Sequence, residues 1–293
     1  MQKWPREKLS CKTKKSMNQP VSLIISFYNK IELLKFIFAA LERQTYRNFE
    51  VIIADDGSKP EIVTEIEHIR LNYFFPIKHV WHEDNGWQKN KILNKAIIAS
   101  ESDYLIFIDG DCIPHKRFVQ EHIENRESNQ LVSGRRILLT EKISKALTLS
   151  KIQHGYFDFQ IGFPLFFQTV FENKKTFMED MIRIRNPYLR KLLLKDRRRY
   201  LLGCNYSVWK SDLLKVNGFD ERFVYPGMGE DTDLEARLAR IGIFCISKKH
   251  LVTIFHVYHV HFDTDHEPNK ILYAENNAYN VTFTPHGIIK QEQ

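Results

Sequence analysis

The sequence has few cysteines and no long apolar segment. Its 4 cysteines lie far apart, and no two of them form a CxxC pair. This spacing argues against a disulfide framework and a structural zinc site, and it is typical of a protein from a reducing cytosol. The N-terminal stretch MQKWPREKLSCKTKK does not resemble a signal peptide, and the longest apolar run, IGFPLFFQTVF, is about half as long as a bilayer span requires. The sequence therefore predicts a cytoplasmic protein with no transmembrane helix.

Positive charge is concentrated in two segments. Residues 183–199 hold eight Lys or Arg and one acid, which gives +7, and residues 1–18 hold six bases and one acid, which gives +5. The rest of the chain therefore carries −5 of the net charge of +7. With 293 residues, 43% apolar and 13% aromatic, the chain is long enough for one large domain or two modest ones with a packed core.

Strand-like and helix-like apolar patterns alternate through the first half of the chain. Strands are expected at residues 21–27, 49–55, 77–83 and 104–109, and helices at 29–44, 60–71 and 90–100. Four alternations within about 90 residues predict a parallel sheet with right-handed crossovers. The polar, basic residues 1–19 are expected to form a mobile tail.

The second half of the chain is patterned less regularly. A further strand is expected at residues 131–139 in LVSGRRILL, and a mostly helical, basic insertion fills the remainder of 136–200. A second organised block covers residues 201–262 and ends in the strand-like LVTIFHVYHVHF. We therefore expect one domain over residues 20–262, followed by a polar, weakly patterned extension at 263–293.

Two carboxylates, Asp109 and Asp111, end the apolar strand YLIFID. Such a pair is often only a solvated turn, but charge at the end of a buried strand is unfavourable unless a cation or hydrogen-bond donors meet it. In open α/β sheets, ligands bind beyond the carboxyl ends of the strands, and Gly110 lets the backbone approach a ligand closely. Hard oxygen ligands at this position suit Mg²⁺ or Mn²⁺ bound together with phosphate oxygens.

A second acidic pair, Asp55 and Asp56, ends the strand FEVIIAD. The simpler interpretation is an Asx turn between strand and helix. However, four carboxylates at the ends of two strands of one sheet repel each other unless some accept hydrogen bonds and others bind metal. The base and ribose of a nucleotide offer such donors.

Three acids crowd the start of the helix in GEDTDLEARL, namely Glu230, Asp231 and Asp233. Capping of the positive helix end explains one or two of them. The preceding FVYPGMGED, with its glycines and proline, is typical of a mobile lip that carries a carboxylate to a reacting group.

Three histidines lie close together in HVYHVHF, namely His256, His259 and His261. Alternation in a strand places His256 on the face opposite to the other two, unless the strand ends between them. A lone histidine here is more often structural, but three in six residues favour metal binding by one of them.

In order and spacing, VSLIISFYNK, LERQTYRNFEVIIADDGS, GWQKNKILNKAI and YLIFIDGDCIP resemble the nucleotide-binding half of glycosyltransferase family 2. GCNYSVWKSDLLKVNGFDERFVYPGMGEDTDLEARLARIG resembles the acceptor-side segment of β-1,4-galactosyltransferases and of chondroitin polymerases. The resemblance covers about residues 20–135 and 200–262. It implies a GT-A fold, which is a Rossmann-like, mostly parallel sheet flanked by helices, and an inverting hexosyl transfer from a UDP-sugar.

The resemblance also implies roles for individual residues. Those expected to bind the nucleotide sugar are Ser26, Tyr28, Asp55, Asp56, Lys91, Asp109 and Gly110. The metal, Mn²⁺ or Mg²⁺, is expected on Asp111, on His256 as first choice or His259 as second, and on Asp109. Asp231 corresponds to the catalytic base, and Glu230 to a carboxylate that binds the acceptor.

Two segments depart from the family pattern. In GWQKNKILN, Lys91 stands where many relatives have Arg, so it can neutralise diphosphate but lacks the bidentate fork of Arg. Gly227-Met228-Gly229 replaces the Trp-Gly pair of galactosyltransferases, which weakens any inference about the acceptor sugar. The expected acceptor is a glycan or a lipid-linked molecule in surface polysaccharide or lipopolysaccharide synthesis.

Other functions remain as alternatives. A sugar nucleotidyltransferase requires a glycine-rich phosphate loop that SFYNKIELL lacks, and a P-loop kinase requires a GxxxxGK[ST] motif that is absent. A catalytically inactive nucleotide-sugar-binding module is a third alternative. The basic residues 181–202 are either a solvated face or a contact with the anionic inner face of the cell membrane, and nucleic acid is not expected as a partner.

Overall fold

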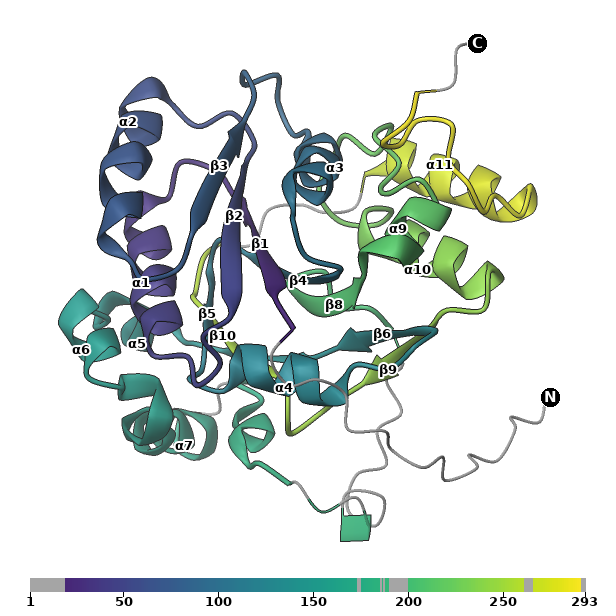
Figure 1. Ribbon diagram of the computed structural model, residues 1–293. Coiled ribbons are helices and arrows are strands. Elements are labelled where there is room, and N and C mark those ends of the chain that lie inside the picture. Colours follow the sequence, from purple (N-terminus) through teal and green to yellow (C-terminus); the bar gives the residue numbers. More distant parts are fainter. Residues whose placement is uncertain are drawn as a thin grey trace.

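A computed structural model describes residues 19–172, 175–184, 186, 188–189, 200–260 and 266–290 (Figure 1). Residues 1–18 of the expected tail and much of the basic segment 181–202 lie outside the described residues. None of the described helices is long and apolar enough to cross a membrane.

A seven-stranded sheet with the order β3-β2-β1-β4-β8-β6-β9 forms the centre of the molecule. Its strands are β1 (Val21–Phe27), β2 (Phe49–Asp55), β3 (Ile77–Trp81), β4 (Tyr104–Asp109), β6 (Gln130–Ser133), β8 (Asn205–Trp209) and β9 (Phe244–Ser247). The strands β3, β2, β1 and β4 are parallel, as the alternating pattern predicts, and β8 is antiparallel to both of its neighbours. The carboxyl ends of β1, β2 and β4 therefore meet at one edge of the sheet.

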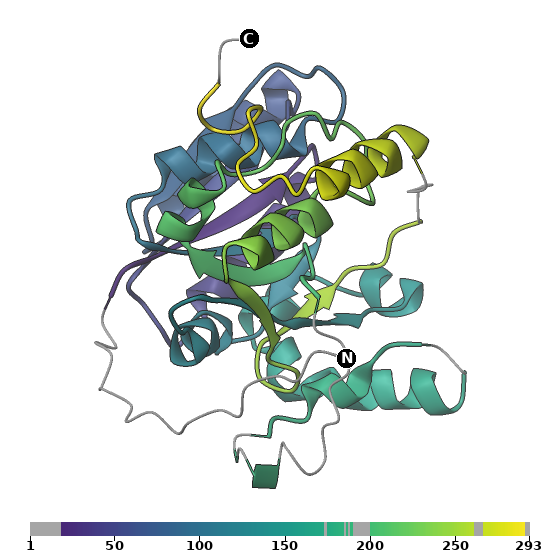
Figure 2. The ribbon, with the colours of Figure 1, turned by 90° about the vertical axis from the view of Figure 1, so that its right-hand side faces the viewer.

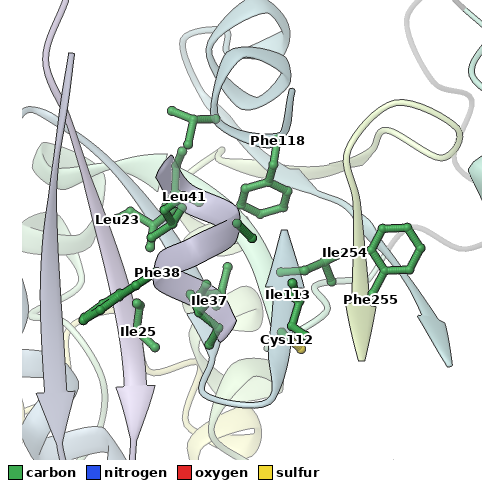
Figure 3. Packing of buried hydrophobic residues seen from close by; sticks show 14 of the residues in the cluster. Leu23, Ile25, Ile37, Phe38, Leu41, Cys112, Ile113, Phe118, Ile254 and Phe255 are labelled. Carbon is green, nitrogen blue, oxygen red and sulfur yellow. The ribbon is translucent and has the colours of Figure 1, made fainter. Parts of the chain in front are cut away.

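Helices cover both faces of this sheet (Figure 1). Those on one face are α1 (Ile31–Glu42) and α2 (Pro60–Ile69), and those on the other are α3 (Lys89–Ala99), α9 (Lys210–Lys215) and α10 (Asp231–Arg240). In the first layer, Leu23 and Ile25 of β1 belong to the same buried cluster as Phe38 of α1 (Figure 3). In the second, Ile24 is buried with Leu234 of α10. Burial on both faces explains why the central strands are apolar throughout.

A smaller sheet with the order β5-β10-β7 lies beside the main one. It is formed by β5 (Cys112–Pro114), β7 (Arg135–Leu138) and β10 (Thr253–His256). The prediction of one strand over 131–139 is therefore wrong, because the chain leaves the main sheet at Gly134 and continues as β7. A Cβ atom at Gly134 would overlap the side chain of Asn205 and the carbonyl oxygen of Val252, so only glycine allows this close passage.

Short helices follow β7. These are α5 (Glu141–Lys145), α6 (Leu149–Gln153), η2 (Tyr156–Gln160), α7 (Gly162–Val170) and η3 (Met178–Met181). The remaining helices are α4 (Phe118–Asn125), which packs on the main core, a short turn η1 (Arg70–Asn72), and α11 (Glu267–Ala278). Helix α11, which the weak pattern of residues 263–293 did not reveal, lies beside α10 (Figure 2).

Candidate functional site

A pocket of about 620 Å³ lies at the carboxyl edge of β1, β2 and β4. Its lining includes six of the residues predicted to bind the nucleotide sugar or metal, namely Ser26, Tyr28, Asp56, Asp109, Gly110 and Asp111. It also includes Asp84, Trp87 and Lys89, which are not among the site residues predicted from the sequence. Gly110 lies against the backbone of β1, because a Cβ atom there would be only 2.8 Å from the carbonyl oxygen of Ser26.

The two acids that end β2 differ in their surroundings. Asp55 is completely buried, and its carboxylate interacts with the His79 Nε2 atom at 2.8 Å and accepts the Ser58 backbone N–H at 2.9 Å. Asp56 reaches the pocket, where it interacts with His82 Nε2 at 2.8 Å and accepts the Gln88 backbone N–H at 3.0 Å. Burial raises the pKa of Asp56, although these hydrogen bonds act in the opposite direction. Asp55 thus stabilises the loop that follows β2, and its contact with a nucleotide stays a prediction.

Lys89, the first residue of α3, connects the two halves of the site. Its Nζ atom lies 2.8 Å from Asp109 Oδ1 and 2.6 Å from Glu230 Oε1. Burial alone would lower the pKa of Lys89, but the two carboxylates raise it well above its usual value, so the side chain stays charged. The predicted phosphate ligand, Lys91, is absent from the pocket lining, and its Nζ atom donates to Gln88 Oε1 at 3.3 Å. The family pattern points to Lys91, whereas the structure places Lys89 between Asp109 and Glu230.

The acids at the start of α10 fall into two groups. Burial raises the pKa of Glu230 to about 7, with a partly compensating effect of Lys89. Burial also raises the pKa of Asp231, whose Oδ2 atom accepts the Gly203 backbone N–H at 2.9 Å. Asp233 points away into the core, where its Oδ2 atom accepts Arg237 Nε–H at 2.7 Å. Glu230 is therefore joined to the pocket through Lys89, Asp233 stabilises the fold, and the catalytic role of Asp231 stays a prediction.

Asp111, His256 and His259 converge at the small sheet. One possible ligand atom of each lies within 4.8 Å of those of the other two. The imidazole Nε2 atoms of His256 and His259 are 3.6 Å and 3.3 Å from the Asp111 carboxylate. The strand β10 ends at His256, so strand alternation no longer holds, and both histidines reach the same carboxylate. His261 lies outside the described residues.

This cluster has a donor set that suits a divalent cation. Burial lowers the pKa of His256, which keeps its imidazole neutral, as a metal ligand must be. A carboxylate with two imidazoles accepts several divalent metals, including Mn²⁺. Asp109 differs from the three, because its Oδ1 atom already accepts hydrogen bonds from Ser26 Oγ and Lys89 Nζ, both at 2.8 Å. Its expected role as a metal ligand stays a prediction.

The layered α/β architecture with acids at the carboxyl edge is that of the GT-A fold. The model of the family "Glycosyl transferase family 2" matches residues 22–190, and that of the "N-terminal domain of galactosyltransferase" matches residues 188–260. The chain therefore belongs to glycosyltransferase family 2.

Relatives include much longer proteins. The chain is 29% identical to a chondroitin synthase of Escherichia coli over 238 residues, which are 76% of this chain and 33% of that protein. It is 26% identical to a hyaluronan synthase of Pasteurella multocida, with 76% of this chain and 23% of that protein covered. The chain thus spans about a third or less of the length of these relatives.

Solved structures share the fold at low identity. S. aureus TarS in complex with UDP has a TM-score of 0.53 and 14% identity, with 81% of this chain and 60% of that chain covered. A mannosyltransferase from Pyrobaculum calidifontis in complex with GDP-Man and Mn²⁺ has a TM-score of 0.50 and 14% identity, with 81% and 56% covered.

Proposed function

We propose that the protein is an inverting hexosyltransferase that moves a sugar from a UDP-sugar to a hydroxyl of a glycan or lipid-linked acceptor. The observation that carries this proposal is the position of Lys89, which bridges Asp109 and Glu230 at 2.8 and 2.6 Å. One ammonium group thus joins the carboxylate expected on the donor side to the one expected on the acceptor side. The chondroitin and hyaluronan synthases among the relatives support a role in surface polysaccharide or lipopolysaccharide synthesis.

The donor occupies the pocket at the carboxyl edge in this proposal. Asp56 accepts hydrogen bonds from the base or ribose, and Ser26 and Gly110 line the wall next to Asp109. Tyr28 is half exposed, and its hydroxyl donates to Asp84 at 2.9 Å, so it can close over a bound nucleotide. Lys89 provides positive charge toward the diphosphate, which is the part of the donor that leaves with the negative charge.

Asp231 acts as the general base in this mechanism. The acceptor hydroxyl attacks the anomeric carbon on the face opposite to the diphosphate, and its proton passes to the Asp231 carboxylate. The new bond from oxygen to carbon forms as the bond to the diphosphate breaks, which inverts the anomeric centre. Burial of Asp231 raises its pKa and strengthens it as a base. Glu230 accepts a hydrogen bond from the acceptor and holds it in line.

Asp111, His256 and His259 are the residues that would hold Mn²⁺ or Mg²⁺. A divalent cation bound there would supply further positive charge to the diphosphate oxygens. The fit rests on the convergence of one carboxylate and two imidazoles whose ligand atoms lie within 4.8 Å of one another.

Two variants test this proposal. With Mn²⁺ and a panel of UDP-sugars and glycan acceptors, we expect Asp111→Ala and Asp231→Asn each to reduce UDP release at least about 1,000-fold. Asp231→Asn should still bind UDP with unchanged affinity, whereas Asp111→Ala should lose the part of that affinity that depends on Mn²⁺. Full transfer activity in either variant, or in excess chelator, would refute the assignment. UDP-sugar binding without transfer to any acceptor would favour the inactive binding module.

The chain also carries the basic segment 181–202, for which we propose contact with the anionic inner face of the cell membrane. Most of residues 185–199 lies outside the described residues, so this proposal rests on composition alone. Eight bases against one acid at residues 183–199 favour attraction to anionic lipid.

A further inference from the structure

Tyr206 of β8 has a buried ring and a hydroxyl without a protein partner. The residue is 2% exposed, and its ring stacks on that of Phe107 in β4, with centroids 4.7 Å apart and an angle of 4° between the planes. Among the described residues, none forms a hydrogen bond with the Tyr206 hydroxyl. Tyr104 is buried as well, but its hydroxyl is bonded to Ser207 Oγ at 2.6 Å. Tyr206 is thus an exception, since buried polar groups are normally satisfied.

Packing of the core does not require this hydroxyl. Tyr206 is paired with Phe107 on the adjacent strand, so both rings lie on the same face of the sheet. Both belong to the buried cluster that also contains Phe219 and Leu234. A phenylalanine at position 206 would keep the stack and would leave no buried polar group without a partner. The core alone therefore favours phenylalanine, which indicates that the hydroxyl has a partner outside the protein.

The charged groups of the proposed reaction surround the Tyr206 hydroxyl. Four of them are close enough for their charges to act on its pKa, namely Glu230, Lys89, Asp231 and Asp109. Burial first, and then the negative charge of Glu230, raise the pKa of Tyr206 well above its usual value, so the hydroxyl stays a protonated donor. Lys89 also lines the pocket at the carboxyl edge, as does Ile92, which belongs to the same buried cluster as Tyr206. The hydroxyl therefore lies between the wall of the pocket and the acids at the start of α10.

The charge of these four groups indicates the chemistry of the partner. Three carboxylates and one ammonium carry an excess of negative charge when the acids are ionised, which disfavours a further anion at this point. The carboxylates are themselves engaged, because Glu230 and Asp109 both contact Lys89. Asp231 accepts the Gly203 backbone N–H. A neutral sugar suits this place, since its hydroxyl groups can donate to carboxylates and accept from a phenol.

We propose that the Tyr206 hydroxyl donates a hydrogen bond to a hydroxyl oxygen of a bound sugar. This inference rests on the proposed transferase function and deepens it, because it makes Tyr206 a sugar-binding residue near the expected base, Asp231. The sugar is either the one that is transferred or that of the acceptor, and both offer the same chemistry to a phenol. Loss of one such bond between neutral groups weakens binding about tenfold.

The variant Tyr206→Phe tests the inference, because it removes a single oxygen atom. Affinities for UDP, UDP-glucose, UDP-galactose, UDP-N-acetylglucosamine and UDP-glucuronate are measured by calorimetry with Mn²⁺, and the KM for glycan acceptors is obtained from UDP release. Tyr206→Phe should melt at the wild-type temperature or above it, since the stack is kept. If the contact is with the transferred sugar, the variant should bind the UDP-sugar about tenfold more weakly and UDP equally well. If it is with the acceptor, the acceptor KM should rise about tenfold at unchanged donor affinity.

Tyr104→Phe is the matched control. The Tyr104 hydroxyl is bonded to Ser207 inside the core, so its removal should lower the melting temperature. Affinity for UDP-sugars and the rate of transfer should stay at the wild-type values at temperatures where the variant is folded. The two variants should therefore have opposite effects, because one hydroxyl serves the fold and the other serves the substrate.

Two results would overturn the inference. The first is a Tyr206→Phe protein with wild-type affinities and wild-type kinetics, which is expected if water satisfies the hydroxyl. The second is equal weakening of UDP and UDP-sugar binding, which would assign the contact to the nucleotide. A wild-type protein that binds UDP-sugars but releases no UDP with any acceptor would instead refute the transferase proposal, and the affinities of the two proteins for UDP and UDP-sugars would then decide the inference alone. A wild-type protein that binds no UDP-sugar would refute both.

Discussion

At the scale of single residues, the chemistry of the site depends on how its buried charges are compensated. Lys89, Asp109 and Glu230 have side chains that are 17%, 30% and 12% exposed, so water solvates each of them poorly. When both carboxylates are ionised, the three side chains together carry one excess negative charge. The excess contributes to the raised pKa of Glu230, which is pushed up mainly by burial and further by Asp109. In the proposed reaction, the acceptor and the diphosphate therefore enter a site whose charge balance is set by Lys89.

Removal of Lys89 should therefore affect both stability and activity. For Lys89→Met we expect a loss of on the order of 2 kcal/mol in the free energy of unfolding, because two buried carboxylates lose their cation. Transfer should fall at least about 100-fold, since the diphosphate loses a fixed positive charge. Thermal unfolding and UDP release measure the two effects.

Lys91→Met is the matched control for this variant. The Lys91 ammonium bonds only to the amide of Gln88 among the contacts found in the structure, so its removal should change stability by less than about 0.5 kcal/mol. If Lys91→Met were the more damaging change, the phosphate-binding role would return to Lys91, as the sequence pattern predicts.

The raised pKa of Glu230 leads to a pH dependence. A carboxylate with a pKa of about 7 is mostly protonated at pH 6 and mostly ionised at pH 8. Only the ionised form accepts a hydrogen bond from the acceptor with both oxygens, so kcat/KM for the acceptor should rise about tenfold between these pH values. The profile is obtained from initial rates at subsaturating acceptor.

Two variants on α10 separate this titration from others. Glu230→Gln should flatten the profile, because an amide does not titrate. Glu235→Gln should leave it unchanged, since Glu235 lies one turn further along α10 and accepts the Leu201 backbone N–H. A rise through pH 7 that persists in Glu230→Gln would show that another group causes it.

At the scale of elements, the sequence predicts those helices and strands that have a regular apolar period. The strands β1 to β4 and the helices α1 to α3 follow from apolar patterns, and their bounds differ from the expected ones by a few residues at most. Short elements were missed, because β5, β8 and β9 have three to five residues and take their structure from pairing with distant strands. Gly134 separates β6 from β7, and the sequence cannot reveal that Asn205 and Val252 crowd this point.

In the candidate site, too, locally encoded features could be predicted, and features that depend on distant residues could not. Asp109, Asp111, Glu230 and Asp231 could be singled out from the sequence because each lies at the end or the start of a regular element, and their roles in the reaction stay predictions. The pairing of His256 and His259 with Asp111 depends on where β10 ends, which is a tertiary property. The position of Lys89 between two carboxylates was not predicted, because no local feature of the sequence distinguishes Lys89 from Lys91. Its role depends on Glu230, which lies 141 positions further along the chain.

At the scale of the whole molecule, the C-terminal part supports the segment that is expected to bind the acceptor. Asn269 of α11 donates to the backbone carbonyls of Tyr225 and Met228, both at 2.8 Å, and so holds the lip that leads to Glu230. Asn276 donates to Asp233 at 2.9 Å, and Thr284 donates to Asp220 at 2.9 Å. Residues proposed as an extension thus satisfy buried polar groups of the catalytic half.

A chain that ends after residue 262 should therefore be unstable and inactive. Truncation removes hydrogen bonds from Asp233 and Asp220, which keep only Arg237 and Arg222 as side-chain donors. It also removes the Asn269 donor of the two lip carbonyls. Each buried polar group that is left unsatisfied costs about 1 to 3 kcal/mol. The summed loss, several kcal/mol, approaches the total stability of a typical domain. Asn276→Ala is a milder change that should lower the melting temperature, whereas Glu275→Ala, on the exposed side of α11, should not. A truncated chain that melts and transfers sugar like the full one would establish residues 263–293 as a dispensable extension.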